Sequence, residues 1–224
     1  MQATEFLIRT FAPMSDYAPN HEKANILTHA LGFVFGLAAM PVLVYIISEN
    51  QETTLGDVGG SIAYGIGFLM VFGFSTLYHA QKKIKPRQLM KIWDHISIYY
   101  LIAGTYTPFL LAYSTPEDAA LMLWIVWGLA FAGTLFKVFF TGKFRLVSTL
   151  IYLAMGWLIV LSPDSFKEAL PSEQFAWIAI GGASYTIGVV FYLVKSIPFH
   201  HAIWHVFVLG GAICHYMGIY KIFA

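Results

Sequence analysis

The sequence is poor in charged residues and nearly without cysteine. Of its 224 residues, 11% are charged and only Cys214 is a cysteine. A soluble domain normally carries about 25% charged residues, so this composition argues against a water-soluble globular protein. A single cysteine also excludes an intramolecular disulfide framework. The formal net charge of +1 identifies no partner by itself, and we expect none among nucleic acids.

Apolar residues take the place of the missing charge. Hydrophobic residues make up 58% of the chain and aromatic residues 17%, and the mean hydropathy is +0.67. So much apolar surface requires lipid as its solvent, where only helices and closed barrels satisfy their backbone hydrogen bonds. The apolar runs are long and unbroken rather than alternating, which favours helices over barrel strands. We therefore predict an all-α integral membrane bundle.

Seven apolar segments are long enough, or nearly so, to cross a hydrocarbon core of about 30 Å. The predicted spans are 26–48, 58–80, 89–113, 118–140, 145–162, 174–195 and 201–222. The fifth span is the shortest. Because the connections are short, we expect a cytoplasmic N-terminal segment of residues 1–25, followed by one seven-helix transmembrane domain of residues 26–222.

The lysines and arginines predict the orientation of the bundle. Eleven of them fall on the N-terminal side of the membrane, and only Lys167 and Lys221 fall on the opposite side. Cytoplasmic loops carry the excess of positive residues. We therefore predict a cytoplasmic N-terminus and an external C-terminus, in a multi-pass protein of a plasma membrane, the inner membrane if the source is bacterial.

Several ionisable residues lie inside the predicted spans at one depth. His79 ends the second helix, Asp94 lies about one turn into the third, and His201 and His205 open the seventh. All four are therefore expected just inside the cytoplasmic leaflet. Ionisable groups in a membrane are costly and by default mark a functional site, so we predict one here.

The spacing of these residues indicates metal chemistry. His201 and His205 are four residues apart, which places both imidazoles on one helix face. With His79 they form a set of three nitrogen ligands that favours zinc and leaves a fourth position open for water, the pattern of catalytic zinc. Asp94 is the candidate to orient or deprotonate that water, and Ser75, one turn before His79, the candidate to hydrogen-bond the water or a polarised carbonyl.

Simpler interpretations exist for each of these residues. Intramembrane histidines can serve only as hydrogen bonds between helices, which is the role we expect for His29 and His215. Asp94 could form a salt bridge with Lys91, three residues earlier on the same face. His95 is about 100° around the helix from Asp94, so we expect it to face elsewhere.

The sequence resembles the hemolysin III family of bacterial membrane proteins, within the larger progestin and adipoQ receptor family. The resemblance covers residues from about 21 to the C-terminus. Its carriers are Ser75-Thr76-Leu77-Tyr78-His79, Trp93-Asp94-His95, Ile102-Ala103-Gly104-Thr105-Tyr106-Thr107-Pro108, Tyr152-Leu153-Ala154-Met155-Gly156-Trp157 and His201-Ala202-Ile203-Trp204-His205.

The resemblance implies a seven-helix fold and a zinc ion held by His79, His201 and His205, with Asp94 and Ser75 close to the metal. It also implies a similarity to alkaline ceramidases, which hydrolyse a lipid amide, and a role in membrane homeostasis. Two functional hypotheses follow. The chain is either a zinc-dependent hydrolase of a lipid amide or ester bound within the bundle, or a non-enzymatic receptor, regulator or hemolysin-like protein with a structural zinc site.

Overall fold

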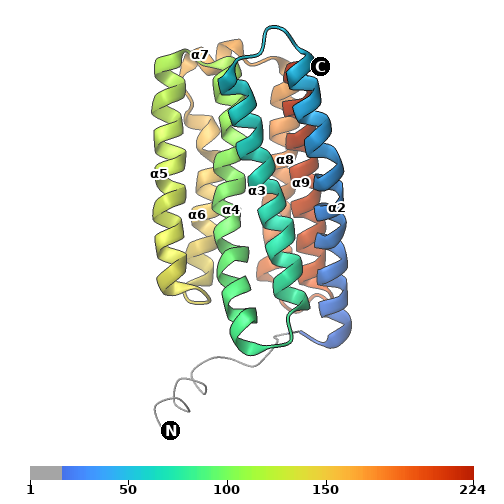
Figure 1. Ribbon diagram of the computed structural model, residues 1–224. Helices are drawn as coiled ribbons and strands as arrows, with labels where there is room; N and C mark the ends of the chain where they lie inside the picture. Colours follow the sequence, from blue (N-terminus) through green and yellow to red (C-terminus); the bar gives the residue numbers. More distant parts are fainter. Residues whose placement is uncertain (1–16) are drawn as a thin grey trace.

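The computed structural model describes residues 17–224, and every regular element in that range is helical (Figure 1). The all-α prediction is therefore confirmed. The elements are α2 (Pro19–Glu49), α3 (Leu55–Ala80), α4 (Ile84–Tyr113), α5 (Pro116–Phe140), α6 (Arg145–Gly156), the 3₁₀ helix η1 (Trp157–Leu161), α7 (Asp164–Ala169), α8 (Ser172–Leu193) and α9 (His200–Phe223).

Six of the described helices are long and apolar enough to cross a membrane: α2, α3, α4, α5, α8 and α9. The fifth predicted span, 145–162, is a composite of the 12-residue α6 and the five-residue η1. At about 1.5 Å per residue for an α-helix and about 2.0 Å for a 3₁₀ helix, the two together extend roughly 28 Å. This composite is the seventh segment of the bundle.

α2 begins at Pro19, seven residues before the predicted span that it contains. Proline is favourable in the first turn of a helix, where its missing N–H costs no hydrogen bond. The first two turns carry Asn20, Glu22, Lys23 and Asn25, so a hydropathy pattern does not detect them. As a result, the polar start of α2 reaches the same end of the bundle as His79.

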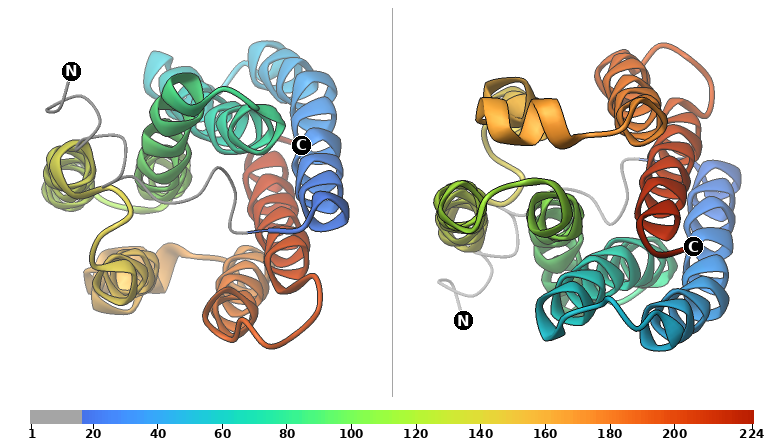
Figure 2. Two further views of the ribbon diagram at one scale, coloured as in Figure 1. Left: turned by 90° about the horizontal axis from the view of Figure 1, so that it is seen from below. Right: turned by 90° about the horizontal axis from the view of Figure 1, so that it is seen from above.

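The helices run side by side (Figures 1 and 2), and most of the lysines and arginines of the described sequence fall near one end of them. α2, α4, α6 and α9 begin at this end, and α3, α5 and α8 finish there. We call it the basic end, because ten of the lysines and arginines in the described range lie in or next to these termini. The distribution of positive charge predicts that the basic end is cytoplasmic.

α3 and α4 are in backbone contact through two glycines. A Cβ atom at Gly104 would lie 2.7 Å from the carbonyl oxygen of Ala63, and one at Gly67 would lie 2.8 Å from the Cα of Leu101. Small residues allow such close approach between membrane helices. The contact fixes α4, which carries Asp94, against α3, which carries Ser75 and His79.

Replacing Gly104 with alanine is expected to lower the free energy of unfolding by about 1–3 kcal/mol, because the added methyl group must push the two backbones apart. Thermal unfolding in detergent measures the effect. Gly128 on α5 is the matched control, since a Cβ there has no neighbour within 4 Å and alanine favours the helix. Equal unfolding temperatures for the two variants would contradict this packing.

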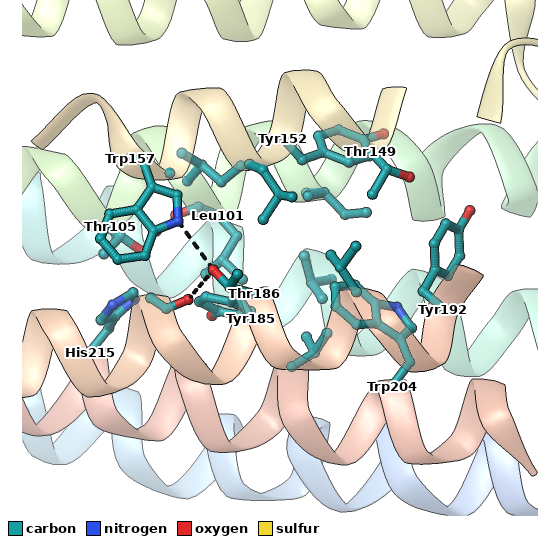
Figure 3. A pocket seen from close by; sticks show the side chains of 18 of the residues that line it. Leu101, Thr105, Thr149, Tyr152, Trp157, Tyr185, Thr186, Tyr192, Trp204 and His215 are labelled. Carbon is teal, nitrogen blue, oxygen red and sulfur yellow. Dashed lines mark hydrogen bonds between the residues drawn. The ribbon is translucent and has the colours of Figure 1, made fainter. Parts of the chain in front are cut away.

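α6 touches α4 and α8 at few places, among them the hydrogen bond from Tyr152 to the His95 carbonyl oxygen, and a large cavity lies between α6 and α4, α8 and α9. The volume of this cavity is about 840 Å³. It extends from Lys91 and Tyr192 at the basic end to Phe166 and Phe175 at the opposite end. Most of its surface is apolar, and Trp157 of η1 bridges it by donating a hydrogen bond to Thr186 of α8 at 3.1 Å (Figure 3).

Candidate metal centre

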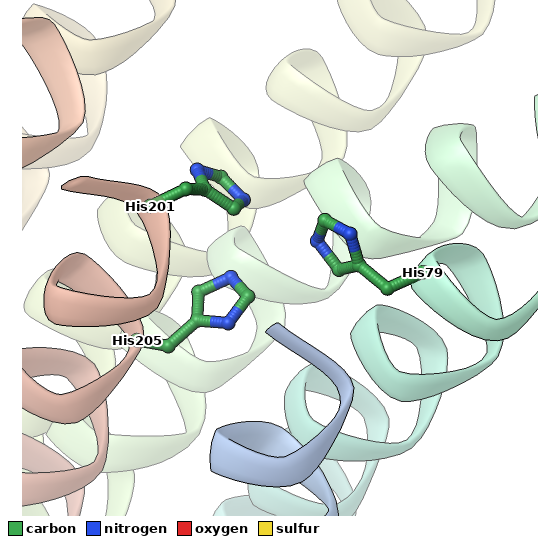
Figure 4. A group of neighbouring side chains, drawn as sticks. All are labelled: His79, His201 and His205. Atoms are coloured by element: carbon green, nitrogen blue, oxygen red, sulfur yellow. The ribbon is translucent and has the colours of Figure 1, made fainter. Parts of the chain in front are cut away.

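Three histidines from two distant parts of the chain converge at the basic end. His79 comes from the last turn of α3, and His201 and His205 come from the first two turns of α9 (Figure 4). One ring nitrogen from each lies within 4.8 Å of the others, close enough for the three to hold one metal ion. The structure therefore brings together the three histidines that the sequence analysis grouped, and their binding of a metal stays a prediction.

The hydrogen bonds of these histidines leave nitrogens available for a metal. His79 Nε2 and His201 Nδ1 are buried and have no hydrogen-bond partner among the described residues. His205 Nδ1 lies 3.3 Å from the carbonyl oxygen of Asn25, to which it can donate, and this bond leaves its Nε2 free to accept. Buried polar nitrogens without partners are unfavourable, and a bound cation would satisfy them.

Glu22, on the first turn of α2, supports the histidine cluster and was missed by the sequence analysis. Its carboxylate lies 2.6 Å from His79 Nδ1 and 2.5 Å from Arg87 Nη2. Histidines that bind metals usually donate their second N–H to such a carboxylate, which fixes the ring and its tautomer. Glu22, Asn25 and Thr28 are each three residues apart, and this spacing could have indicated a polar face on the first turns of α2.

Asp94 and Ser75 line the same cavity as His201 and His205. The side chain of Asp94 is 18% exposed, and its Oδ2 lies 3.7 Å from His95 Nδ1. Within residues 17–224, Asp94 forms no salt bridge with Lys91, so that alternative is not supported. His95 also lines the cavity, contrary to the expectation that it faces elsewhere, and its Nδ1 is 2.7 Å from the carbonyl oxygen of Lys91.

The two remaining intramembrane histidines differ. His215 Nε2 lies 3.3 Å from the carbonyl oxygen of Ile178 on α8, so its predicted role as a hydrogen bond between helices is confirmed. The His29 ring interacts with the backbone of Val71 on α3, but neither of its nitrogens makes a hydrogen bond of regular geometry within residues 17–224. Its ring centroid lies 3.6 Å from that of His205. The His29 ring therefore packs directly against His205, one of the candidate metal ligands.

The chain is similar to proteins of one known family. Residues 17–216 match the family described as Haemolysin-III related. The chain is 41% identical over 191 residues to the hemolysin-3 homolog of Bacillus subtilis (strain 168), covering 85% of this chain and 89% of the relative. It is also 41% identical to hemolysin-3 of Bacillus cereus, with 85% and 86% covered.

A human protein is also similar. The chain is 31% identical over 204 residues to monocyte to macrophage differentiation factor of Homo sapiens, covering 88% of this chain and 82% of the relative. The match to the family includes all of α2 to α8 and α9 as far as Tyr216, and with them all three histidines of the cluster. The chain is a multi-pass membrane protein and belongs to the haemolysin III family.

Proposed function

We propose that this protein is a zinc-dependent hydrolase that cleaves the amide or ester bond of a membrane lipid. The observation that carries the proposal is the cluster of His79, His201 and His205 beside a large apolar cavity that Asp94 and Ser75 also line. We further propose that it works in the inner membrane of a bacterium and contributes to membrane homeostasis.

The three histidines fit zinc better than calcium or magnesium. Zinc accepts imidazole nitrogen, whereas calcium and magnesium require oxygen ligands. His79 and His205 each have one ring nitrogen near an oxygen of α2, and the other nitrogen remains for the ion. When bound, zinc supplies polarisation of a carbonyl and a pKa near 7 for water.

Asp94 and Ser75 would perform the proton transfer and hold the carbonyl. In this proposal Asp94 accepts a proton from the attacking water, whose oxygen bonds to the carbonyl carbon. The C–N or C–O bond then breaks, and Asp94 returns the proton to the leaving nitrogen or oxygen. Ser75 donates a hydrogen bond to the carbonyl oxygen, where negative charge develops. The apolar part of the cavity would hold the acyl chain.

A non-enzymatic regulator with a structural zinc ion is the second candidate. It is favoured by the human relative, whose name describes a differentiation factor and no reaction. Both candidates would retain the same three ligands. The test is therefore to measure zinc content and lipid turnover together, in the wild type and in Asp94→Ala, with fatty acids, amines and lysolipids quantified by mass spectrometry.

Glu22→Gln is expected to weaken zinc binding about 10- to 100-fold, because loss of a carboxylate that orients a ligand has effects of this size. The glutamine removes the charge beside His79 and Arg87 but retains the shape of the side chain. Competition with a chelator of known affinity measures the change. Glu49→Gln, at the exposed far end of the same helix, is the control. Unchanged zinc affinity in Glu22→Gln would show that Glu22 does not orient His79 for zinc.

A further inference from the structure

Five positive side chains line the basic end of the cavity, and each comes from a different segment. They are Lys91 of α4, Lys137 of α5, Lys143 of the following loop, Arg145 of α6 and Lys195 beyond α8. Among residues 17–224, Asp94 is the one carboxylate that lines the cavity with them. We call this end of the cavity, with its five positive side chains, the mouth. It carries a clear excess of positive charge.

The burial of Lys137 is not explained by the preference of cytoplasmic ends for positive residues. A lysine near a helix end normally extends to the membrane surface, but Lys137 is 1% exposed. Its Nζ donates a hydrogen bond to Ser148 Oγ at 2.6 Å and lies 5.6 Å from the ring of Tyr152. Within the described range no carboxylate lies within 4.0 Å of it, and Asp94 attracts it only from a longer distance. A buried ammonium without a close counter-ion is unfavourable.

Arg145 connects this charge to the histidine cluster. Its guanidinium lies 4.3 Å above the ring of Tyr192 and donates a hydrogen bond to the Tyr192 carbonyl oxygen. Its Nε is buried and has no partner among the described residues, so a donor remains available. The Tyr192 ring lies 6.0 Å from the ring of His201. A ligand that contacts Arg145 is therefore next to the candidate metal centre.

Lys91 and several hydroxyl groups complete the mouth. A Cβ atom at Gly142 would lie 3.8 Å from Lys91 Nζ, so this ammonium rests against the loop between α5 and α6. Figure 3 shows Thr149 and Tyr152 of α6 on one side of the cavity and Tyr192 of α8 on the other. These groups supply hydrogen bonds in addition to the positive charge.

We infer that the mouth binds the phosphate of an anionic lipid, whose hydrocarbon chain occupies the apolar part of the cavity. A phosphate monoester carries about −1.5 to −2 charges and three acceptor oxygens at neutral pH, which suits several cations better than a single carboxylate does. Arg145 and Lys137 are the principal ligands, through charge-assisted hydrogen bonds. This inference rests on the proposed function and names its substrate class as phosphate-bearing lipids.

The test uses an ether-linked lysophosphatidate, which has no acyl bond and so reports binding without turnover. Its dissociation constant for the purified protein in detergent is compared with that of the ether-linked glycerol lipid of the same chain, which lacks phosphate. The phosphate lipid is expected to bind roughly tenfold tighter or more, because a single charge-assisted hydrogen bond changes an affinity by about this factor. Equal affinity for the two lipids would overturn the inference.

Variants locate the phosphate. Lys137→Gln and Arg145→Gln should each remove most of the preference for the phosphate lipid, and unchanged binding of the glycerol lipid shows that each variant is folded. Lys85→Gln, an exposed lysine at the basic end that does not line the cavity, should retain the full preference. A preference that survives both cavity variants would overturn the assignment.

Two further measurements distinguish a site for a phosphate lipid from a site for free phosphate and from a site that depends on the metal. Inorganic phosphate alone is expected to bind at least tenfold more weakly than the phosphate lipid, and equal binding would show a site for free phosphate instead. His205→Ala should retain the preference for the phosphate lipid, because the cations do not need zinc. Loss of the preference in His205→Ala would contradict an independent phosphate site, whereas failure to find turnover would bear only on the proposed hydrolysis.

Discussion

Purified wild-type protein is expected to hold about one zinc ion per chain, and His205→Ala protein almost none under the same conditions. The substitution removes one of the three proposed ligands, and the two remaining imidazoles would form an incomplete site. Loss of an outer partner alone weakens metal binding about 10- to 100-fold, so loss of a ligand should weaken it by at least about 10²-fold. Elemental analysis of protein purified without chelator measures the zinc content.

His200→Ala is the matched control for this variant. His200 is also buried at the start of α9, but its Nδ1 lies 3.1 Å from the carbonyl oxygen of Phe191 and it is not part of the cluster. It should retain zinc, whereas His201→Ala, one residue further, should lose it. Full zinc content in folded His205→Ala protein would show that the ligand set is wrong.

Asp94→Ala is expected to reduce lipid hydrolysis about 10²- to 10⁴-fold while most of the zinc remains bound. The reduction is the usual contribution of a general acid–base group. Zinc should remain bound because Asp94 is not one of the three clustered histidines proposed to hold it. Fatty acid release by the purified protein and zinc content are measured on the same preparation. The difference between the two readouts separates a proton-transfer role from a structural one.

Asp164→Ala is the control, since Asp164 lies at the far end of the bundle and its side chain is 88% exposed. It should retain both activity and zinc. Unchanged turnover in Asp94→Ala would exclude Asp94 as the acid–base group. A wild-type protein that holds zinc and hydrolyses no lipid among those tested would favour the regulator with a structural ion.

The sequence predicts a helix best where a long apolar run begins at a residue that can cap the helix. The long apolar runs of α3 and α5 are examples, and each begins at a threonine that caps the helix, Thr54 and Thr115. The prediction was least complete at α2 and α6. The first turns of α2 are polar, and the span that contains α6 continues as a 3₁₀ helix after Gly156. Hydropathy alone shows neither feature.

The candidate site was predictable to the extent that helical spacing and depth are local properties. His201 and His205 are one turn apart on any α-helix, and His79 and Asp94 have the same depth once the helices are assigned. The contact of Glu22 with His79 was not predictable in this way. It spans 57 residues of sequence, and it depends on how far α2 extends and which face of α2 meets α3.

The sequence by itself determined the class of the protein, its long apolar helices and the pair of histidines on α9. It did so because low charge, long apolar runs and a four-residue spacing have the same physical consequence wherever the helices lie. Only the tertiary structure decided that α6 touches α4 and α8 at few places, that the space between them is a cavity, and that Lys137 turns inward to it. Those features depend on packing between helices, which no local pattern of residues encodes.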